Sequence, residues 1–166
     1  FVFPFLLKGK SRMPVAIMAM GIVFNLLNGM MQAGGLFYFA PEGLYADGWA
    51  YLLKPHALLG IILFFAGMFV NLHSDYVIRH LRRPGDTKHY LPGKGLYRYV
   101  TSANYFGELV EWTGFAILTA SPAAWVFVWW TFANLVPRAD AIHRRYREEF
   151  GDEAVGKRKR IIPFLY

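Results

Sequence analysis

Three long stretches of the chain carry no Asp, Glu, Lys or Arg, and their length limits what the chain can fold into. Residues 13–41, 55–74 and 112–137 are uncharged, giving runs of 29, 20 and 26 residues. About 20 consecutive apolar residues let an α-helix cross the hydrocarbon core of a bilayer. A soluble domain of 166 residues seldom has three such runs. The sequence therefore predicts an integral membrane protein with the lipid bilayer as a partner.

Composition excludes several other classes of protein. Residues of the AVILMFWYC set make up 55% of the chain and charged residues 17%, against about 25% charged in an ordinary soluble domain. Intrinsic disorder is excluded because so apolar a chain must bury its surface. With no Cys, disulfides, thiol nucleophiles and thiolate metal sites are excluded too. The five His lack a metal-ligand spacing, so we expect no metal site.

The run lengths predict an all-α, polytopic membrane helix bundle, with residues 1–166 as a single membrane domain. Gly34-Gly35 is predicted to end the first helix, and Ser121-Pro122 to separate the last two helices. The predicted cytosolic tail covers 138–166. The four predicted spans lie near residues 14–33, 52–72, 103–120 and 123–137.

The basic residues support this span count. With four spans, segments 1–12, 74–104 and 138–166 share one side and hold 17 of the 18 Lys and Arg residues. The positive-inside rule places that side in the cytosol. We expect the membrane to be the bacterial inner membrane or the endoplasmic reticulum. The net charge of +7 would also suit nucleic acid. We exclude that partner because the basic face abuts a bilayer.

Polar residues at the ends of two spans are candidates for a site. Asn71, Asp75 and Arg82 fall within about 80° of one another on a helix, together with Arg79. Asn104, Glu108 and Glu111 share one face of the third span. Polar groups at membrane depth are costly and usually line a site. The alternatives are a hydrated helix end with intrahelical ion pairs, and a hydrated carboxylate pair with an Arg partner.

Two further sets lie toward the C-terminus. Arg138, Arg145 and Tyr146 follow the last span, and Lys157–Arg160 stand near the end. Such residues attract anionic lipid or capture phosphates; for Lys157–Arg160 we favour lipid or a structural role. Trp130, four residues before Asn134, shares a helix face with Arg138 and is our candidate substrate-binding residue.

Several motifs resemble the steroid 5-alpha-reductase family, the 3-oxo-5-alpha-steroid 4-dehydrogenases. The resemblance covers essentially the whole chain. It rests on the string from Asn71 through His73-Ser74-Asp75-Tyr76, Arg79 and Leu81-Arg82 to Pro84-Gly85, on Leu91–Leu96, on Tyr99–Trp112, on Arg138-Ala139 with Tyr146, and on Ile162-Pro163-Phe164.

The resemblance implies an NADPH-dependent membrane enzyme that reduces the 4,5 double bond of a 3-oxo-4-ene steroid. Hydride then passes to C5 and a proton to C4. Two positions depart from the family pattern: His89 stands where Tyr is frequent, and Leu7 where Asn is common. The implied cofactor-binding residues are Asn71, Asp75, Arg82, Asn104, Glu108, Arg138 and Tyr146.

The start of the chain resembles the stretch after the family's third span. We therefore expect the missing N-terminal spans of a seven-span enzyme upstream, with the Glu and Tyr that engage the steroid carbonyl. No catalytic residue is assigned to this chain, and the isolated chain is expected to be inactive. The alternatives are a related membrane sterol or enone reductase, an isoprenylcysteine methyltransferase-like enzyme using S-adenosylmethionine, and a non-catalytic lipid-binding membrane adaptor.

Overall fold

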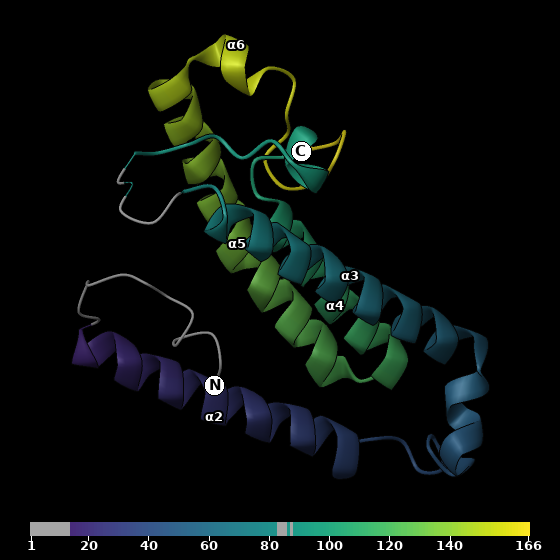
Figure 1. The fold of residues 1–166 in the computed structure, drawn as a ribbon. Coiled ribbons are helices and arrows are strands. Elements are labelled where there is room, and N and C mark those ends of the chain that lie inside the picture. The colour runs from purple at the N-terminus through teal and green to yellow at the C-terminus, as the bar shows by residue number, and fades with distance from the viewer. Residues whose placement is uncertain (1–13, 83–85, 87) are drawn as a thin grey trace.

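The computed structural model describes residues 14–82, 86 and 88–166, and the described residues confirm an all-α fold. Three long helices, α3, α4 and α5, run side by side, while α2 lies to one side and packs its second half against the start of α5 (Figure 1). Within the described residues there is no strand, only an isolated bridge between Val100 and Lys159. The elements in chain order are α2 (Val15–Phe37), η1 (Gly48–Leu53), α3 (Pro55–Arg79), η2 (Gly95–Arg98), α4 (Ala103–Thr119), α5 (Pro122–Phe150) and α6 (Asp152–Val155).

Four glycines let α3 and α4 pack backbone to backbone. Gly60 faces Gly114, and Gly67 faces Gly107, so the two helices are antiparallel with glycines seven residues apart on each. A Cβ on Gly67 would lie 2.2 Å from the backbone N of Glu111, and a Cβ on Gly114 would lie 2.3 Å from that of Phe64. Small residues allow such close approach between membrane helices. We call Gly60, Gly67, Gly107 and Gly114 the glycine seam.

The prediction that Gly34-Gly35 ends the first helix is wrong, because α2 continues to Phe37. Gly35 is buried, and a Cβ there would lie 2.7 Å from both Ala123 Cβ and Ser121 Oγ. Gln32 also donates a hydrogen bond to the carbonyl of Ala123 at 3.3 Å. Gly35 therefore serves helix packing, because it brings α2 against the start of α5.

The four-span count and the span limits stay predictions, and the other helices can be compared with them only by where each helix begins and ends. The break at Ser121-Pro122 is confirmed, since α4 ends at Thr119 and α5 has Pro122 in its first turn. The second helix starts later than predicted, because residues 48–53 form the 3₁₀ helix η1 and α3 begins at Pro55. The helix α5 continues through Pro137 to Phe150, well beyond the predicted span.

The end of the chain returns to the bundle beside the start of α4. The N–H groups of Thr101 and Ser102 donate to the carbonyls of Lys159 and Arg160 at 2.9 and 3.0 Å. Ile161 is buried in a cluster with Leu109, Leu135 and Ala139. Arg160 Nε donates to the Asp140 carboxylate at 2.6 Å, and this contact holds the pKa of Asp140 below its usual range. The tail is thus fixed to α4 and α5.

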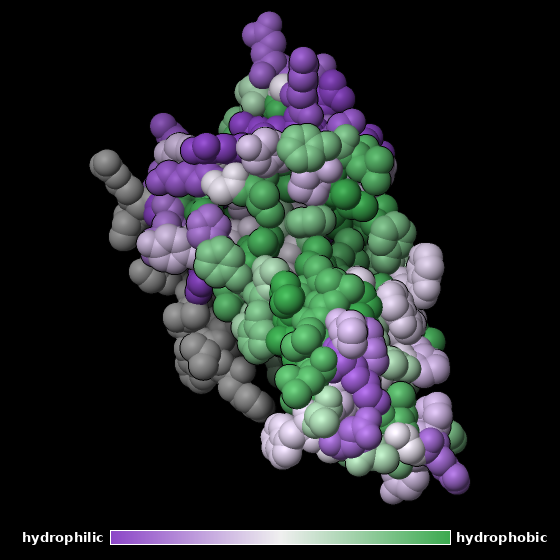
Figure 2. Space-filling model, turned by 90° about the vertical axis from the view of Figure 1, so that its right-hand side faces the viewer, coloured by the Kyte–Doolittle hydropathy of each residue, from purple (hydrophilic) through white to green (hydrophobic). Residues whose placement is uncertain are grey.

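Two helices, α2 and α3, are long and apolar enough to cross a membrane. The helix α4 has 17 residues, which gives a length of about 26 Å against a hydrocarbon core of about 30 Å. One face of the molecule shows apolar side chains in a broad zone, with polar side chains gathered toward the α6 end and at the opposite end (Figure 2).

Candidate functional site

The glycine seam brings two of the predicted polar sets together. A Cβ on Gly107 would lie 2.5 Å from the backbone N of Asn71, so the end of α3 and the start of α4 lie in close contact. The side chain of Asp75 faces that of Asn104, and Glu111 faces Asn71. All four side chains are half-buried. The two sets therefore form one site between the helices.

Tyr97 belongs to the same site, and sequence reasoning missed it. The side chain is 1% exposed, and its hydroxyl donates to Asn104 Oδ1 at 3.4 Å. Burial raises the pKa of Tyr97, with Tyr146 and Asp75 adding to the effect, so the hydroxyl stays protonated and orients the Asn104 amide. Tyr97 lies in the short helix η2, which is too short for a hydrophobic periodicity that could predict its contact with Asn104.

Glu108 connects these residues to α5. It is half-buried and lies within electrostatic range of Glu111, Asp75 and Arg138. Unpaired carboxylates in an apolar environment are costly, and the amides of α3 and α4 and the nearby guanidinium of α5 reduce that cost here. We call Asn71, Asp75, Tyr97, Asn104, Glu108 and Glu111 the polar cluster.

Of the other predicted cofactor residues, Arg138 and Tyr146 lie near this cluster, whereas Arg82 lies near the loop after α3. Arg138 is exposed and close enough to act on Glu108. Tyr146 is half-buried and lies within range of Tyr97. Arg82 is exposed, and it lies within range of Asp86 and Tyr90, in the loop that follows α3.

Trp130, the predicted substrate-binding residue, lies apart from the polar cluster, where α5 meets α2. Its ring stacks on Phe24 with centroids 5.7 Å apart, and 56% of the side chain is exposed. Phe24 also contacts Phe127, at 6.3 Å between ring centroids. Aromatic side chains of α2 and α5 thus pack together, and we call Phe24, Phe127 and Trp130 the aromatic wall.

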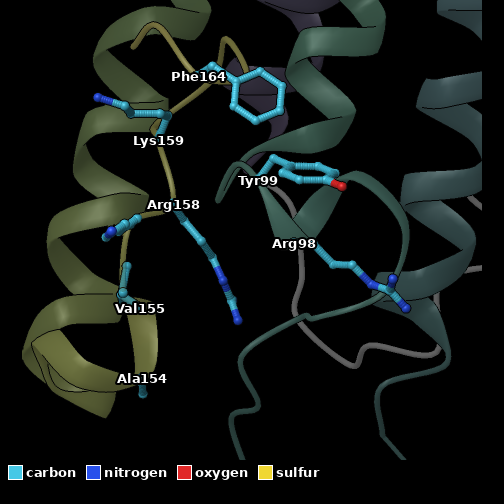
Figure 3. A pocket seen from close by; sticks show the side chains of 9 residues that line it. Arg98, Tyr99, Ala154, Val155, Arg158, Lys159 and Phe164 are labelled. Carbon is cyan, nitrogen blue, oxygen red and sulfur yellow. The ribbon is translucent and has the colours of Figure 1, made fainter.

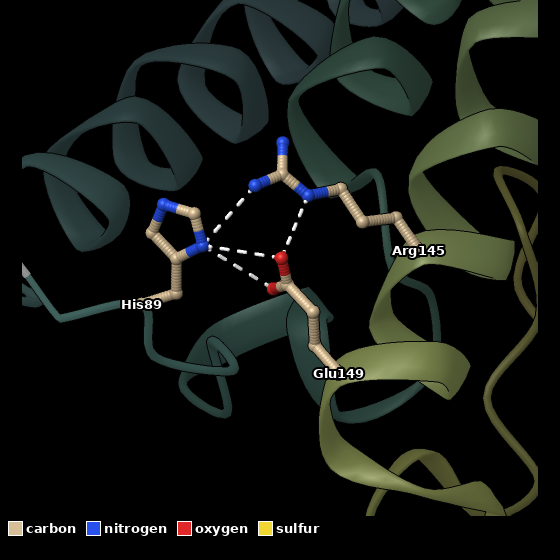
Figure 4. A network of polar contacts seen from close by, with 3 residues as sticks. All are labelled: His89, Arg145 and Glu149. Atoms are coloured by element: carbon tan, nitrogen blue, oxygen red, sulfur yellow. Dashed lines mark hydrogen bonds and ion pairs between the residues drawn. The ribbon is translucent and has the colours of Figure 1, made fainter.

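Of the two positions that depart from the family pattern, the structure describes only His89; Leu7 lies outside the described residues. His89 Nδ1 lies 3.2 Å from Glu149 Oε1 and 3.1 Å from an Arg145 guanidinium nitrogen. Arg145 also donates to Glu149 at 2.9 Å (Figure 4). This network fastens the loop before η2 to the far end of α5.

The donor and acceptor types of the polar cluster suit a nucleotide cofactor. Carboxylates and amides accept from or donate to ribose hydroxyls and a carboxamide, whereas phosphates require cations such as Arg138 and Arg82. In the part of the chain that the structure describes, no three His, Asp or Glu side chains are placed to hold a metal ion.

Fold and site together define a helical membrane protein with a half-buried polar cluster where α3, α4 and α5 meet. A family model described as 3-oxo-5-alpha-steroid 4-dehydrogenase matches residues 11–166. The chain therefore belongs to this family, and the resemblance seen in its motifs is confirmed.

Individual relatives match over the whole chain. Identity is 42% over 165 residues to 3-oxo-5-alpha-steroid 4-dehydrogenase 1 of Homo sapiens, covering 99% of this chain and 61% of that protein. It is 43% over 164 residues to the Bos taurus protein of the same name, covering 99% and 62%. It is 38% over 166 residues to 3-oxo-5-alpha-steroid 4-dehydrogenase 2 of Homo sapiens, covering 100% and 63%. The chain thus spans about three fifths of the length of these relatives.

Proposed function

We propose that this chain supplies the NADP(H) site of a membrane enzyme that reduces the 4,5 double bond of 3-oxo-4-ene steroids. The relatives are named as 3-oxo-5-alpha-steroid 4-dehydrogenases, which supports the reaction class. The observation that carries the proposal is the convergence of Asp75 and Asn104, with Glu108 in range of Arg138, where three helices meet.

The residues divide by the chemistry each can offer. Asn71 and Asn104, with Asp75 and Glu108, provide amide and carboxylate groups for the nicotinamide carboxamide and ribose hydroxyls. Arg82, Arg138 and Tyr146 provide the cations and a hydroxyl for the phosphates. Glu111, which faces Asn71, holds the cluster together.

NADPH, when bound, supplies the hydride that adds to C5 of the steroid, and C4 gains a proton. The chain's part is to fix the position of the nicotinamide. Tyr97 does so indirectly: as a buried, protonated donor to Asn104, it sets which way the amide points. A fixed donor–acceptor set costs little reorganisation when the reaction occurs.

The steroid is proposed to bind at membrane depth, against the aromatic wall of Trp130 and Phe24. A rigid apolar substrate favours a concave, mostly aromatic site with few polar groups. The groups that polarise its 3-carbonyl are assigned to no residue of this chain. We propose that they come from additional spans, as the length of the relatives allows.

The membrane arrangement is part of the proposal. The helices α2, α3, α4 and the first half of α5 cross the bilayer, and the basic loops and C-terminus face the cytosol. The polar cluster then lies at the cytosolic end of the bundle, where a soluble dinucleotide can reach it while the steroid enters from lipid.

The proposal is tested by replacing cofactor-binding residues in the full-length protein and titrating NADPH by calorimetry. Asp75→Ala and Arg82→Ala should each weaken binding by about 10-fold or more, because each removes a charge-assisted hydrogen bond of about 1.5–3 kcal/mol. The control is Lys54→Ala, since Lys54 pairs with Asp47 at 2.7 Å in the η1 region and should not affect NADPH. Unchanged affinity in both variants would contradict the cofactor assignment.

A further inference from the structure

A basic hollow lies between the C-terminal tail and η2. Its volume is about 570 Å³, and none of the residues that line it is acidic. Arg158 points into the space between the tail and residues 98–99, while Arg98 and Lys159 extend to either side (Figure 3). At one end, the rings of Tyr99 and Phe164 lie 5.2 Å apart. The charged and aromatic lining residues are Arg98, Tyr99, Lys157, Arg158, Lys159 and Phe164.

A second hollow adjoins the basic one beside α3. Its volume is about 420 Å³; Phe69, Val70 and His73 line it, and it shares Arg98 and Tyr99 with the basic hollow. Phe69 is 69% exposed, on a helix that is long and apolar enough to cross a membrane. We treat the two adjoining hollows as one amphipathic groove, with cationic residues lining the first hollow and Phe69 and Val70 of α3 lining the second.

This groove is separate from the polar cluster. At 100° per residue, Phe69, Val70 and His73 lie about 120–180° around α3 from the stripe of Asn71 and Asp75. A ligand in the groove therefore contacts the opposite side of the helix from a cofactor at the polar cluster.

Hydrogen bonds to the bundle hold the basic tail in place. Lys159 N–H donates to the Tyr99 carbonyl at 2.8 Å, so the tail is fixed a few residues before the start of α4 at Ala103. Arg158 donates a hydrogen bond to the Pro92 carbonyl at 2.9 Å, and a guanidinium has further N–H groups that can donate to a phosphate. Phe164 and Leu165 are 77% and 74% exposed beside these cations. Apolar and basic side chains together are typical of a surface at the membrane interface.

We propose that the groove binds one anionic phospholipid of the surrounding leaflet. Its phosphate contacts Arg158, Arg98 and Lys157, and an acyl chain lies against Phe69 and Val70. A soluble phosphate would use the same cations, but it would leave the apolar half of the groove empty. The proposal requires α3 to lie in the membrane and is independent of the cofactor assignment.

The experiment counts lipids that stay bound to the full-length protein. The protein is reconstituted in phosphatidylcholine with a minor fraction of phosphatidylglycerol, extracted, and examined by native mass spectrometry. The variants are Arg98→Gln/Lys157→Gln, which removes phosphate contacts, and Val70→Phe, which narrows the apolar half. The control is Lys88→Gln/Lys94→Gln, which removes the same charge from exposed positions outside the groove.

We expect selective retention of phosphatidylglycerol by the unmodified protein. Retention of phosphatidylglycerol by Arg98→Gln/Lys157→Gln should fall about fivefold for each cation removed. Val70→Phe should also lower this retention. The control should change less than twofold, and NADPH affinity should be equal in all variants. Equal loss in the control, full retention by Val70→Phe, displacement by equimolar glycerol phosphate, or weaker NADPH binding in the double variant would each overturn the proposal.

Discussion

Adding a single methyl group at Gly67 tests whether the glycine seam positions the polar cluster. The new Cβ would lie 2.2 Å from the backbone N of Glu111 and 2.7 Å from the carbonyl oxygen of Gly107. Ordinary contact begins near 3.4 Å, so α4 must move by about 1.2 Å. Backbone atoms cannot rotate away as a flexible side chain can, and overpacking of this kind typically costs about 1–3 kcal/mol.

The assay for Gly67→Ala is thermal unfolding in detergent together with NADPH calorimetry. We expect a loss of stability and also weaker NADPH binding, because the displaced segment of α4 carries Asn104 and Glu108. The matched control is Gly21→Ala, in the middle of α2, where a Cβ would meet nothing within 4 Å. That change should be neutral or stabilise by up to about 1 kcal/mol through helix propensity. Equal stability of the two variants would refute the close approach of α3 and α4.

Three further outcomes are expected. Glu108→Gln should reduce turnover of the full-length enzyme more than it reduces folded yield, whereas Glu111→Gln should reduce folded yield more than turnover. If both substitutions lower only the folded yield, the two carboxylates have a structural role. Burial holds the pKa of His143 below its ordinary value of 6.5. Stability should therefore fall as pH drops below about 6.5, by at most about 1.4 kcal/mol per pH unit, and His143→Gln should flatten this fall in melting scans; an unchanged slope would exclude His143 as the cause. Trp130→Ala should raise the KM for steroid and leave NADPH affinity unchanged. Normal steroid kinetics in this variant would show that Trp130 faces lipid and does not bind the substrate.

Hydropathy and helical spacing predicted much of the fold and the site. The uncharged runs predicted the apolar helices, and Ser121-Pro122 predicted the break between α4 and α5, because proline favours a first turn. The spacing of Asn71 with Asp75, and of Asn104 with Glu108, predicted two polar faces. The structure places these faces against each other.

The features that the sequence did not reveal depend on contacts between distant segments. A glycine in an apolar helix is compatible both with a helix end and with close packing, and only the position of Ser121 and Ala123 shows which applies to Gly35. Tyr97 is a member of the site because η2 folds beneath Asn104. No local pattern encodes that contact.

The most direct test of the account is which cofactor the purified full-length protein binds. Calorimetric titrations with NADPH and with S-adenosylmethionine would distinguish a reductase from a methyltransferase-like enzyme, and both from a non-catalytic adaptor. We expect saturable binding of NADPH, weakened by Asp75→Ala, and no binding of S-adenosylmethionine. Binding of S-adenosylmethionine, or of neither compound, would contradict the assignment of the polar cluster as an NADP(H) site.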